Sequence, residues 1–247
     1  MTDSALREGA VEGVALDYPS AEILLRVTTE IERKYRIHAC RKEPWTVDWL
    51  DRYVQPDDVL YDIGANVGAF TLIAAVARKA RVVAFEPGFA TYGRLCENIQ
   101  LNGCNGAVVT FPLPLAESNG MTTLLYRSME VGQSRHSLKK DWHFGQSTKE
   151  GRVAQPMSTI TLDTARTLFG WPDPSHIKLD VDGAELRVLT GAAATLRLPS
   201  LRSLMVEADQ ALWPQIRELV TEAGFRLNTA VDRGDAPTYA LFERTAV

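Results

Sequence analysis

The segment Val59-Leu-Tyr-Asp-Ile-Gly-Ala-Asn-Val-Gly-Ala-Phe70 organises the rest of the chain. A β-prone apolar run ends at Asp62-Ile63, and Gly64 and Gly68 follow it. From Phe70 onward, apolar residues recur at helical spacing. This order predicts a strand, a tight glycine turn and a helix. A ligand at such a turn can lie against bare backbone and meet the open N–H groups of the helix N-terminus.

The spacing of the two glycines distinguishes between kinds of nucleotide-binding turn. An NAD site needs Gly-x-Gly-x-x-Gly, and Gly64-Ala-Asn-Val-Gly68 lacks the middle glycine that admits a pyrophosphate. The Gly-Lys-Ser/Thr of a Walker loop does not follow either. The pattern Asp-x-Gly-x-x-x-Gly resembles the first motif of class I S-adenosylmethionine (SAM) methyltransferases. A purely structural turn with Asn66 as helix N-cap remains open.

Composition limits the class of protein and its partners. A length of 247 residues fits one large α/β domain with an extension, or at most two small domains. The net charge of −4, without a basic patch, argues against a nucleic-acid partner. We find neither a membrane-length apolar run nor a signal peptide, so we expect a soluble, cytoplasmic protein with no membrane partner. The three cysteines, Cys40, Cys96 and Cys104, show no metal-site spacing and predict no disulfide framework.

The chain is expected to divide into an N-terminal helical extension, residues 1–50, and a main domain, residues 51–247. Apolar spacing predicts one helix from Ala21 to Arg36 and a second over Thr46–Tyr53. The extension carries no chemistry of its own. It could form a lid or cap over the site, or a helix packed on the sheet.

The second strand supports a nucleoside site. The apolar run Arg81–Phe85 ends in Glu86, and Pro87 stops it. An acidic residue at this position can accept hydrogen bonds from both ribose hydroxyls, as in NAD-binding folds. A carboxylate that caps the following helix is the structural alternative.

The remaining elements follow from the same kinds of pattern. Residues 129–152 form the least regular part and include His136 and His143, so this loop is either substrate-facing or a solvated excursion. Asp163 is expected to cap a short helix that runs through Phe169. The other expected elements are a helix over Tyr92–Leu101, strands over Val108–Pro114, Met121–Ser128, Val153–Leu162 and Leu201–Val206, a helix over Leu212–Ala223, and a terminal hairpin over Phe225–Val231 and Thr238–Arg244.

The stretch from His176 to Gly191 is the second informative segment. Its strand ends at Asp180. Asp182 and Glu185 have the spacing of a capping box, which would explain both residues structurally. Asp180 has no such structural explanation, and it lies at the carboxyl end of a central strand, where open α/β sheets bind ligands.

Several of these stretches together resemble the FkbM family of SAM-dependent methyltransferases, over about residues 45–210. The resemblance implies the class I Rossmann-like fold, an α/β fold with a mostly parallel sheet of seven strands, six parallel and the last antiparallel, and helices on both faces. It also implies O-methylation of a hydroxyl on a sugar, polyketide or other natural product. The stretches are Asp62-Ile-Gly-Ala-Asn-Val-Gly68, Phe85-Glu-Pro87, Asn98-Ile-x-Leu-Asn102, Thr161-Leu-Asp163 and Ile177-Lys-Leu-Asp-Val-Asp-Gly-Ala-Glu-Leu-x-Val-Leu-x-Gly191.

The resemblance also implies roles for particular residues. The glycine turn would lie beneath the methionine part of SAM, Glu86 would hold the ribose, and Asp180 would lie beside the transferred methyl group and the acceptor. Asp182 departs from the family, which usually has Glu there. The implied cofactor residues are Asp62, Gly64, Asn66, Gly68, Glu86, Pro87, Leu115, Ala116, Glu117 and Asp180.

The mechanism that follows is methyl transfer from SAM, with S-adenosylhomocysteine as product. The acceptor hydroxyl must lose its proton, and Asp180 is the first candidate for the general base, followed by His136 or His143. No metal is expected; if one is used, Asp180, Glu207 and Asp209 are the candidate ligands. A SAM-binding module without transferase activity and an NAD-dependent oxidoreductase are the alternatives. Neither the identity of the methyl acceptor nor the oligomeric state follows from the sequence.

Overall fold

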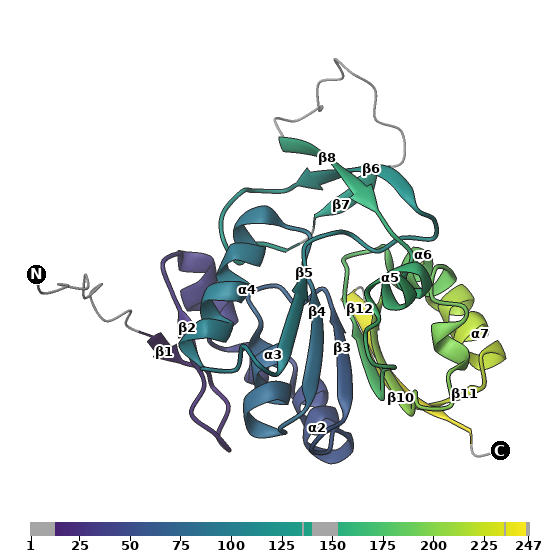
Figure 1. Ribbon diagram of the computed structural model, residues 1–247, viewed down its shortest axis with the longest axis horizontal. Helices are drawn as coiled ribbons and strands as arrows, with labels where there is room; N and C mark the ends of the chain where they lie inside the picture. The colour runs from purple at the N-terminus through teal and green to yellow at the C-terminus, as the bar shows by residue number, and fades with distance from the viewer. Residues whose placement is uncertain (1–12, 135, 140–152, 235, 246–247) are drawn as a thin grey trace, which may run out of the picture.

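A seven-stranded sheet forms the centre of the molecule in the computed structural model, which describes residues 13–134, 136–139, 153–234 and 236–245 (Figure 1). The strand β12 is antiparallel to both of its neighbours, and the other pairings are parallel. The expected sheet of six parallel strands and one antiparallel strand is therefore confirmed. In spatial order the strands are Phe225–Arg233 (β11), Ala236–Arg244 (β12), Ser203–Ala208 (β10), His176–Leu179 (β9), Val59–Ile63 (β3), Arg81–Phe85 (β4) and Val108–Phe111 (β5).

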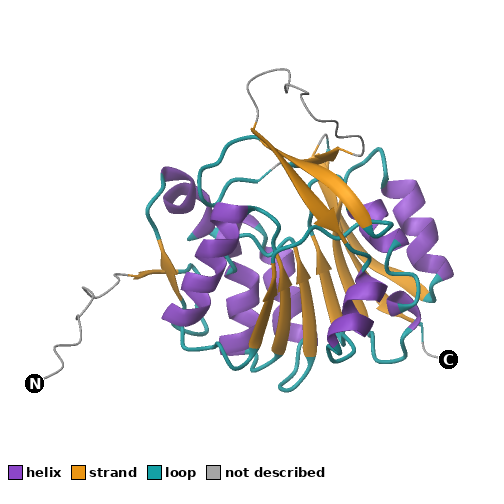
Figure 2. Ribbon diagram, turned by 45° about the horizontal axis from the view of Figure 1, so that its top comes forward, coloured by secondary structure: helices purple, strands orange, loops and turns teal. Residues whose placement is uncertain are grey.

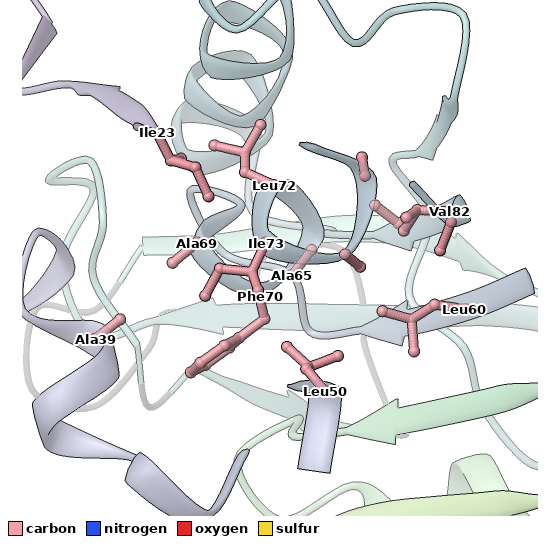
Figure 3. Close-up of a cluster of buried hydrophobic side chains, with 14 of the residues drawn as sticks. Ile23, Ala39, Leu50, Leu60, Ala65, Ala69, Phe70, Leu72, Ile73 and Val82 are labelled. Atoms are coloured by element: carbon pink, nitrogen blue, oxygen red, sulfur yellow. The ribbon is translucent and has the colours of Figure 1, made fainter. Parts of the chain in front are cut away.

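Helices cover both faces of this sheet, so the central strands are buried on both sides and are rich in apolar residues, apart from the buried Asp62, His176 and Lys178. In β3, Leu60 packs into one hydrophobic cluster, while Tyr61 and Ile63 pack into the other. Figure 3 shows the first cluster. Its helices are Pro44–Tyr53 (α2), Ala69–Leu72 (α3), the continuing π-helical turn Ile73–Ala77 (η2) and Phe89–Leu101 (α4). The other face is covered by Leu162–Phe169 (α5), Glu185–Thr190 (α6), Thr195–Arg197 (η4) and Trp213–Glu222 (α7).

The N-terminal segment is only partly helical. The predicted helix over Ala21–Arg36 is wrong in its first half, because Leu24–Arg26 (β2) pairs as a strand with Gly13–Ala15 (β1). Ile23 and Leu25 alternate inward, and neither is more than 1% exposed. A π-helical turn, Glu32–Arg36 (η1), and the short helix Ala39–Lys42 (α1) follow. Since α2 spans residue 50, the division into residues 1–50 and 51–247 stays a prediction.

A second, three-stranded sheet lies over the ends to which the parallel strands point (Figure 2). It has the order β7-β6-β8, with Gly120–Tyr126 (β6), Ser137–Lys139 (β7) and Val153–Thr159 (β8). The strands predicted on either side of the irregular segment are present, whereas β7 lies inside that segment and was not predicted. The Tyr126 hydroxyl accepts a hydrogen bond of 3.1 Å from the Phe89 N–H, which ties this sheet to the start of α4.

Both predicted caps of the later helices are wrong. Thr161, not Asp163, caps α5, because its hydroxyl accepts from the Thr164 N–H at 3.0 Å. The Asp163 carboxylate instead accepts from the N–H groups of Ala194 and Thr195, at 2.8 and 2.7 Å. Asp163 therefore joins α5 to η4.

The capping box at α6 is replaced by a different brace. Asp182 has a left-handed backbone, with φ of 54°, and α6 begins only at Glu185. The buried Glu185 carboxylate reaches back and accepts from the Val181 and Gly183 N–H groups at 3.2 and 3.1 Å. Hydrogen bonds to Glu185 thus hold the turn after Asp180.

Asn66 does not cap α3 either. Its backbone is left-handed, with φ of 51°, and Gly68 occupies the position before the first helical residue. Cys40, Cys96 and Cys104 are free thiols, as expected. In the part of the chain that the structure describes, no helix has the length and apolarity needed to cross a bilayer.

Candidate functional site

The sheet register places the two informative segments side by side. Ile63 of β3 pairs with Phe85 of β4 and with Leu179 of β9. The residues that follow these three strand ends, Gly64, Glu86 and Asp180, therefore meet at one edge of the sheet. The N–H of Gly64 donates to the Phe85 carbonyl at 2.9 Å, and the N–H of Asp180 donates to the Ile63 carbonyl at 3.0 Å.

Both glycines of the turn are required by packing within the chain. Gly64 has φ of 86°, and a Cβ there would lie 1.7 Å from the Asp180 carbonyl oxygen. Gly68 has φ of 94°, and a Cβ there would lie 2.6 Å from Leu95 of α4. The residue after β9 and the helix α4 thus pack so closely against the turn that neither glycine has room for a side chain. Without a side chain, the backbone of Gly64 is open to the cavity described below.

Glu86 is held across the glycine turn by backbone hydrogen bonds. Its Oε2 accepts from the Asn66 N–H at 3.0 Å, and its Oε1 accepts from the Gly88 N–H at 2.7 Å. Burial raises the pKa of Glu86 to about 7, although both N–H donors act to lower it. Because each carboxylate oxygen has a second lone pair, Glu86 can accept two further hydrogen bonds from a ligand in the cavity.

Asp180 belongs to a line of hydrogen-bonded and paired groups. Burial would raise the pKa of Asp180, but the charge of Lys178 and a hydrogen bond from Glu207 outweigh burial and lower it. The Lys178 Nζ lies 3.5 Å from the Asp180 carboxylate. Burial and the neighbouring Asp180 charge raise the pKa of Glu207 to about 9, so Glu207 carries the shared proton.

Asp62 lies beneath the turn and is fully buried. Its Oδ2 accepts from the Thr71 hydroxyl at 2.6 Å, and its Oδ1 lies 3.6 Å from the Lys178 Nζ. Asp62 therefore joins β3, α3 and β9, and it reaches Asp180 through their common partner Lys178.

A cavity of about 1140 Å³ opens above these residues. It is bounded by the strand ends, by the three-stranded sheet and by the N-terminal segment. Nine of the residues predicted for the site line it: Gly64, Asn66, Glu86, Pro87, Leu115, His136, Asp180, Glu207 and Asp209.

The other predicted residues take different positions. Among the described residues, Asp62, Gly68, Ala116 and Glu117 do not line the cavity. The Glu117 carboxylate accepts from the Arg187 Nε of α6 at 2.6 Å. His143 lies outside the described residues.

His136 is a weaker proton acceptor than its position suggests. Its Nδ1 accepts from the Arg127 N–H at 3.3 Å, and its ring packs edge-on against Tyr126 at 5.0 Å. Burial and the nearby charge of Arg36 lower its pKa. The neutral ring then carries its proton on Nε2, so neither ring nitrogen is free to accept another proton.

A group of three or more His, Cys, Asp or Glu side chains placed to hold a metal ion is not found among the described residues. Asp209 is turned to its own loop, where its Oδ1 accepts from the Ala211 N–H at 2.9 Å.

Two groups of residues that line the cavity were not predicted from the sequence. Ile31, Tyr35, Arg36 and Lys42 come from the N-terminal segment, and Tyr239 comes from β12. Tyr239 is 3% exposed on a strand next to β10. A tyrosine hydroxyl within a largely apolar strand could have indicated a polar site there. Arg36 stood in a predicted amphipathic helix, where a charged residue carries no signal.

With the geometry established, comparison with known proteins identifies the family. Residues 62–227 match the family described as the methyltransferase FkbM domain. The chain belongs to this family. Membership of the FkbM family confirms the predicted resemblance and identifies the protein as a methyltransferase. Methyl transfer is therefore favoured over the oxidoreductase alternative.

Two FkbM relatives resemble most of the chain. Hexuronic acid methyltransferase AglP of Haloferax volcanii is 29% identical over 230 residues, which cover 93% of this chain and 88% of the relative. Methyltransferase sdnD of Sordaria araneosa is 29% identical over 195 residues, covering 67% of this chain and 73% of the relative.

Solved methyltransferases share the fold at low sequence identity. Magnesium protoporphyrin IX methyltransferase (ChlM) from Synechocystis PCC 6803, with bound SAM, has a TM-score of 0.52 at 13% identity, over 89% of this chain and 86% of that chain. The METTL16 methyltransferase domain has a TM-score of 0.51 at 13% identity, over 85% of this chain and 68% of that chain. The predicted class I fold is confirmed.

Proposed function

We propose that this FkbM protein transfers the methyl group of SAM to a hydroxyl oxygen of a small molecule. The observation that carries the proposal is the placement of Glu86 and Asp180 on opposite sides of Gly64, with both carboxyl groups facing one cavity. One carboxylate suits a nucleoside and the other suits a proton transfer.

The described residues fit the adenosine part of SAM. Glu86 offers two oxygens whose remaining lone pairs suit the vicinal hydroxyls of a ribose. Leu115, which is buried and lines the same cavity, offers an apolar surface next to it. The bound sulfonium supplies a methyl group that is already activated for transfer, so the protein needs no covalent catalysis.

The chain then has two tasks, positioning and proton removal. Holding the acceptor oxygen at near-attack distance can be worth roughly 7–11 kcal/mol. Asp180 accepts the hydroxyl proton as the oxygen attacks, because its carboxylate is ionised and faces the cavity. Lys178 keeps that carboxylate charged, and the hydrogen bond from Glu207 fixes its orientation.

The acceptor class is supported by the relatives and by the site. AglP is named for its action on a hexuronic acid, which carries several hydroxyl groups. The cavity of about 1140 Å³ matches a cofactor together with one small acceptor, since ligand pockets for small molecules hold roughly 300–1,000 Å³. A sugar, a polyketide or another hydroxylated natural product fits this description.

Calorimetric titration with S-adenosylhomocysteine tests the proposal. The wild type should bind at micromolar concentration, and Glu86→Ala should weaken binding by about 1.5–3 kcal/mol, as expected for lost hydrogen bonds to a charged group. Glu218→Ala, on the exposed face of α7, is the control and should bind like the wild type. A wild type that does not bind S-adenosylhomocysteine would refute the cofactor assignment.

A further inference from the structure

Arg36 lines the cavity from a part of the chain that lies before the FkbM match. It is the last residue of η1, and its Nε donates to the Gly132 carbonyl at 2.7 Å. To the residues that the structure describes, the terminal Nη1 and Nη2 groups make no hydrogen bond or ion pair. Four N–H donors of a permanently charged group are therefore available to a ligand.

Two buried cations of the described chain have carboxylate partners. Arg94 is paired with the buried Glu32, and Lys178 lies within 4 Å of both Asp62 and Asp180. Arg36 is half-buried. Burial lowers its pKa, and the charges of Asp180 and three other carboxylates oppose this from a distance. Partial burial makes a close anion favourable for a guanidinium, and an anionic group of the ligand would supply one.

The position of Arg36 indicates where that anion lies. Its charge acts on Glu86, on Asp180 and on His136, so the guanidinium lies within electrostatic reach of both carboxyl groups that define the cavity. An anion bound there would be close to both the nucleoside end and the proton-accepting end of the site.

The guanidinium is also held in place before any ligand binds. Three successive carbonyl groups accept hydrogen bonds from three separate elements: Val131 from the Thr29 hydroxyl at 3.1 Å, Gly132 from Arg36 at 2.7 Å, and Gln133 from the Asn66 amide at 3.1 Å. Gly132 has φ of 81°, and a Cβ there would lie 3.4 Å from the Arg36 Cγ. This packing orders the guanidinium in advance, which lowers the entropic cost of binding.

We infer that Arg36 is the carboxylate-binding residue of the site, supplied by the N-terminal segment. A planar guanidinium fork binds a carboxylate through two parallel hydrogen bonds. The carboxylate can belong to the amino-acid end of the cofactor or to an acidic acceptor. This inference rests on the proposed function, since both sources presuppose the methyltransferase site.

Calorimetry with two cofactor fragments distinguishes the sources. S-adenosylhomocysteine has the carboxylate, whereas 5′-methylthioadenosine keeps the nucleoside and lacks the amino-acid end. If Arg36 binds the cofactor carboxylate, Arg36→Gln should weaken S-adenosylhomocysteine binding by about 10–100-fold and leave 5′-methylthioadenosine binding unchanged. If Arg36 binds the acceptor, Arg36→Gln should bind S-adenosylhomocysteine and 5′-methylthioadenosine with wild-type affinity. Its complex with S-adenosylhomocysteine should no longer bind D-glucuronate, whereas the wild type and Arg36→Gln should bind D-glucose equally.

Two further variants act as controls. Arg33→Gln, on the exposed side of η1, should bind every probe like the wild type. Arg36→Lys keeps the charge without the fork, so it should weaken binding by less than Arg36→Gln. The inference is overturned if Arg36→Gln binds all four probes like the wild type, or if it weakens S-adenosylhomocysteine and 5′-methylthioadenosine equally. A wild type that binds neither adenosine compound would overturn the proposed function itself.

Discussion

Asp180 keeps its negative charge mainly through its neighbours. Lys178 lies 3.5 Å from its carboxylate, and Glu207 donates a hydrogen bond to it. Tyr239 lines the same cavity, so β9, β10 and β12 all contribute polar groups there. Such an arrangement lets Asp180 gain a proton while its surroundings hold it in place.

Replacement of Asp180 by Asn separates proton transfer from cofactor binding. Asn keeps the size of the side chain and cannot accept the hydroxyl proton. We expect Asp180→Asn to lower the rate of methyl transfer by about 10²–10⁴-fold on an acceptor that the wild type methylates. The affinity for S-adenosylhomocysteine should change by less than about 1 kcal/mol. Asp48→Asn, on the exposed face of α2, is the matched control; near-normal turnover of Asp180→Asn would rule it out as the base.

At the residue level, the sequence predicted those groups that follow strand ends. Glu86 and Asp180 were found because an acidic residue directly after an apolar strand lies at the ligand-binding edge of a parallel sheet. Arg36 and Tyr239 reach the same cavity from the two ends of the chain, and no local pattern reports contacts at that separation. His136 was predicted correctly to line the cavity, although its hydrogen bond from Arg127 was not foreseeable.

At the element scale, two asparagines, Asn98 in α4 and Asn102 directly after it, hold the N-terminal strand. Asn98 accepts from the Arg26 N–H and donates to the Val67 carbonyl of the glycine turn, both at 2.8 Å. Asn102 accepts from the Leu24 N–H at 2.9 Å and donates to the Leu24 carbonyl at 2.7 Å. These two side chains bond to the backbone of β2 as a neighbouring strand would. This role explains both asparagines of the stretch Asn98-Ile-x-Leu-Asn102.

The role of Asn98 can be measured as stability. Asn98→Ala leaves the Arg26 N–H and the Val67 carbonyl without their partners at a site where Asn98 is 0% exposed. We expect a loss of about 1–3 kcal/mol in the free energy of unfolding, measured by urea denaturation. Asn105→Ala, in the exposed turn after α4, should change it by less than about 0.5 kcal/mol. Equal stabilities of the two variants would contradict this account.

The same contacts explain where prediction of elements succeeded and failed. The strands β3, β4 and β9 were predicted because helices bury both faces, and such strands are rich in apolar residues. β2 was mistaken for a helix because its hydrogen-bonding partners, Asn98 and Asn102, stand more than seventy residues away. The capping box at α6 failed because Glu185 bonds to the turn before it instead of to Asp182.

At the scale of the whole molecule, stability against pH depends on buried groups with opposite behaviour. Burial raises the pKa values of Glu86 and Glu185 from 4.5 to about 7, so folding favours their neutral forms, and the stability that these forms contribute is lost as the pH rises from about 4.5 to about 7. His176 behaves in the opposite way. Burial and the charge of Arg202 lower its pKa to about 4, so the folded state keeps the ring neutral.

His176 occupies the end of the molecule opposite the cavity and joins several segments there. Its Nδ1 bonds to the Ser203 hydroxyl at 2.7 Å, and that hydroxyl also accepts from the Trp49 indole N–H at 2.9 Å. Its Nε2 lies 3.2 Å from the Asp58 carboxylate and 3.1 Å from Arg202. A proton on this ring would have to be accommodated at a site that is 1% exposed, between α2, β9 and β10.

The acid limb of stability should therefore depend on His176. In the unfolded chain, histidine takes up a proton near pH 6.5, whereas the folded chain resists protonation until about pH 4. The stability that the neutral ring contributes is complete above about pH 6.5 and is lost as the pH falls toward 4, by about 3 kcal/mol in all. Urea denaturation of the wild type and of His176→Gln between pH 7.5 and pH 4.5 isolates this contribution, because Glu86 and Glu185 titrate equally in both proteins. Over that range the free energy of unfolding of the wild type should fall by about 2–3 kcal/mol more than that of His176→Gln. Parallel plots of the two unfolding free energies against pH would show that the ring is protonated as readily in the folded chain as in the unfolded one.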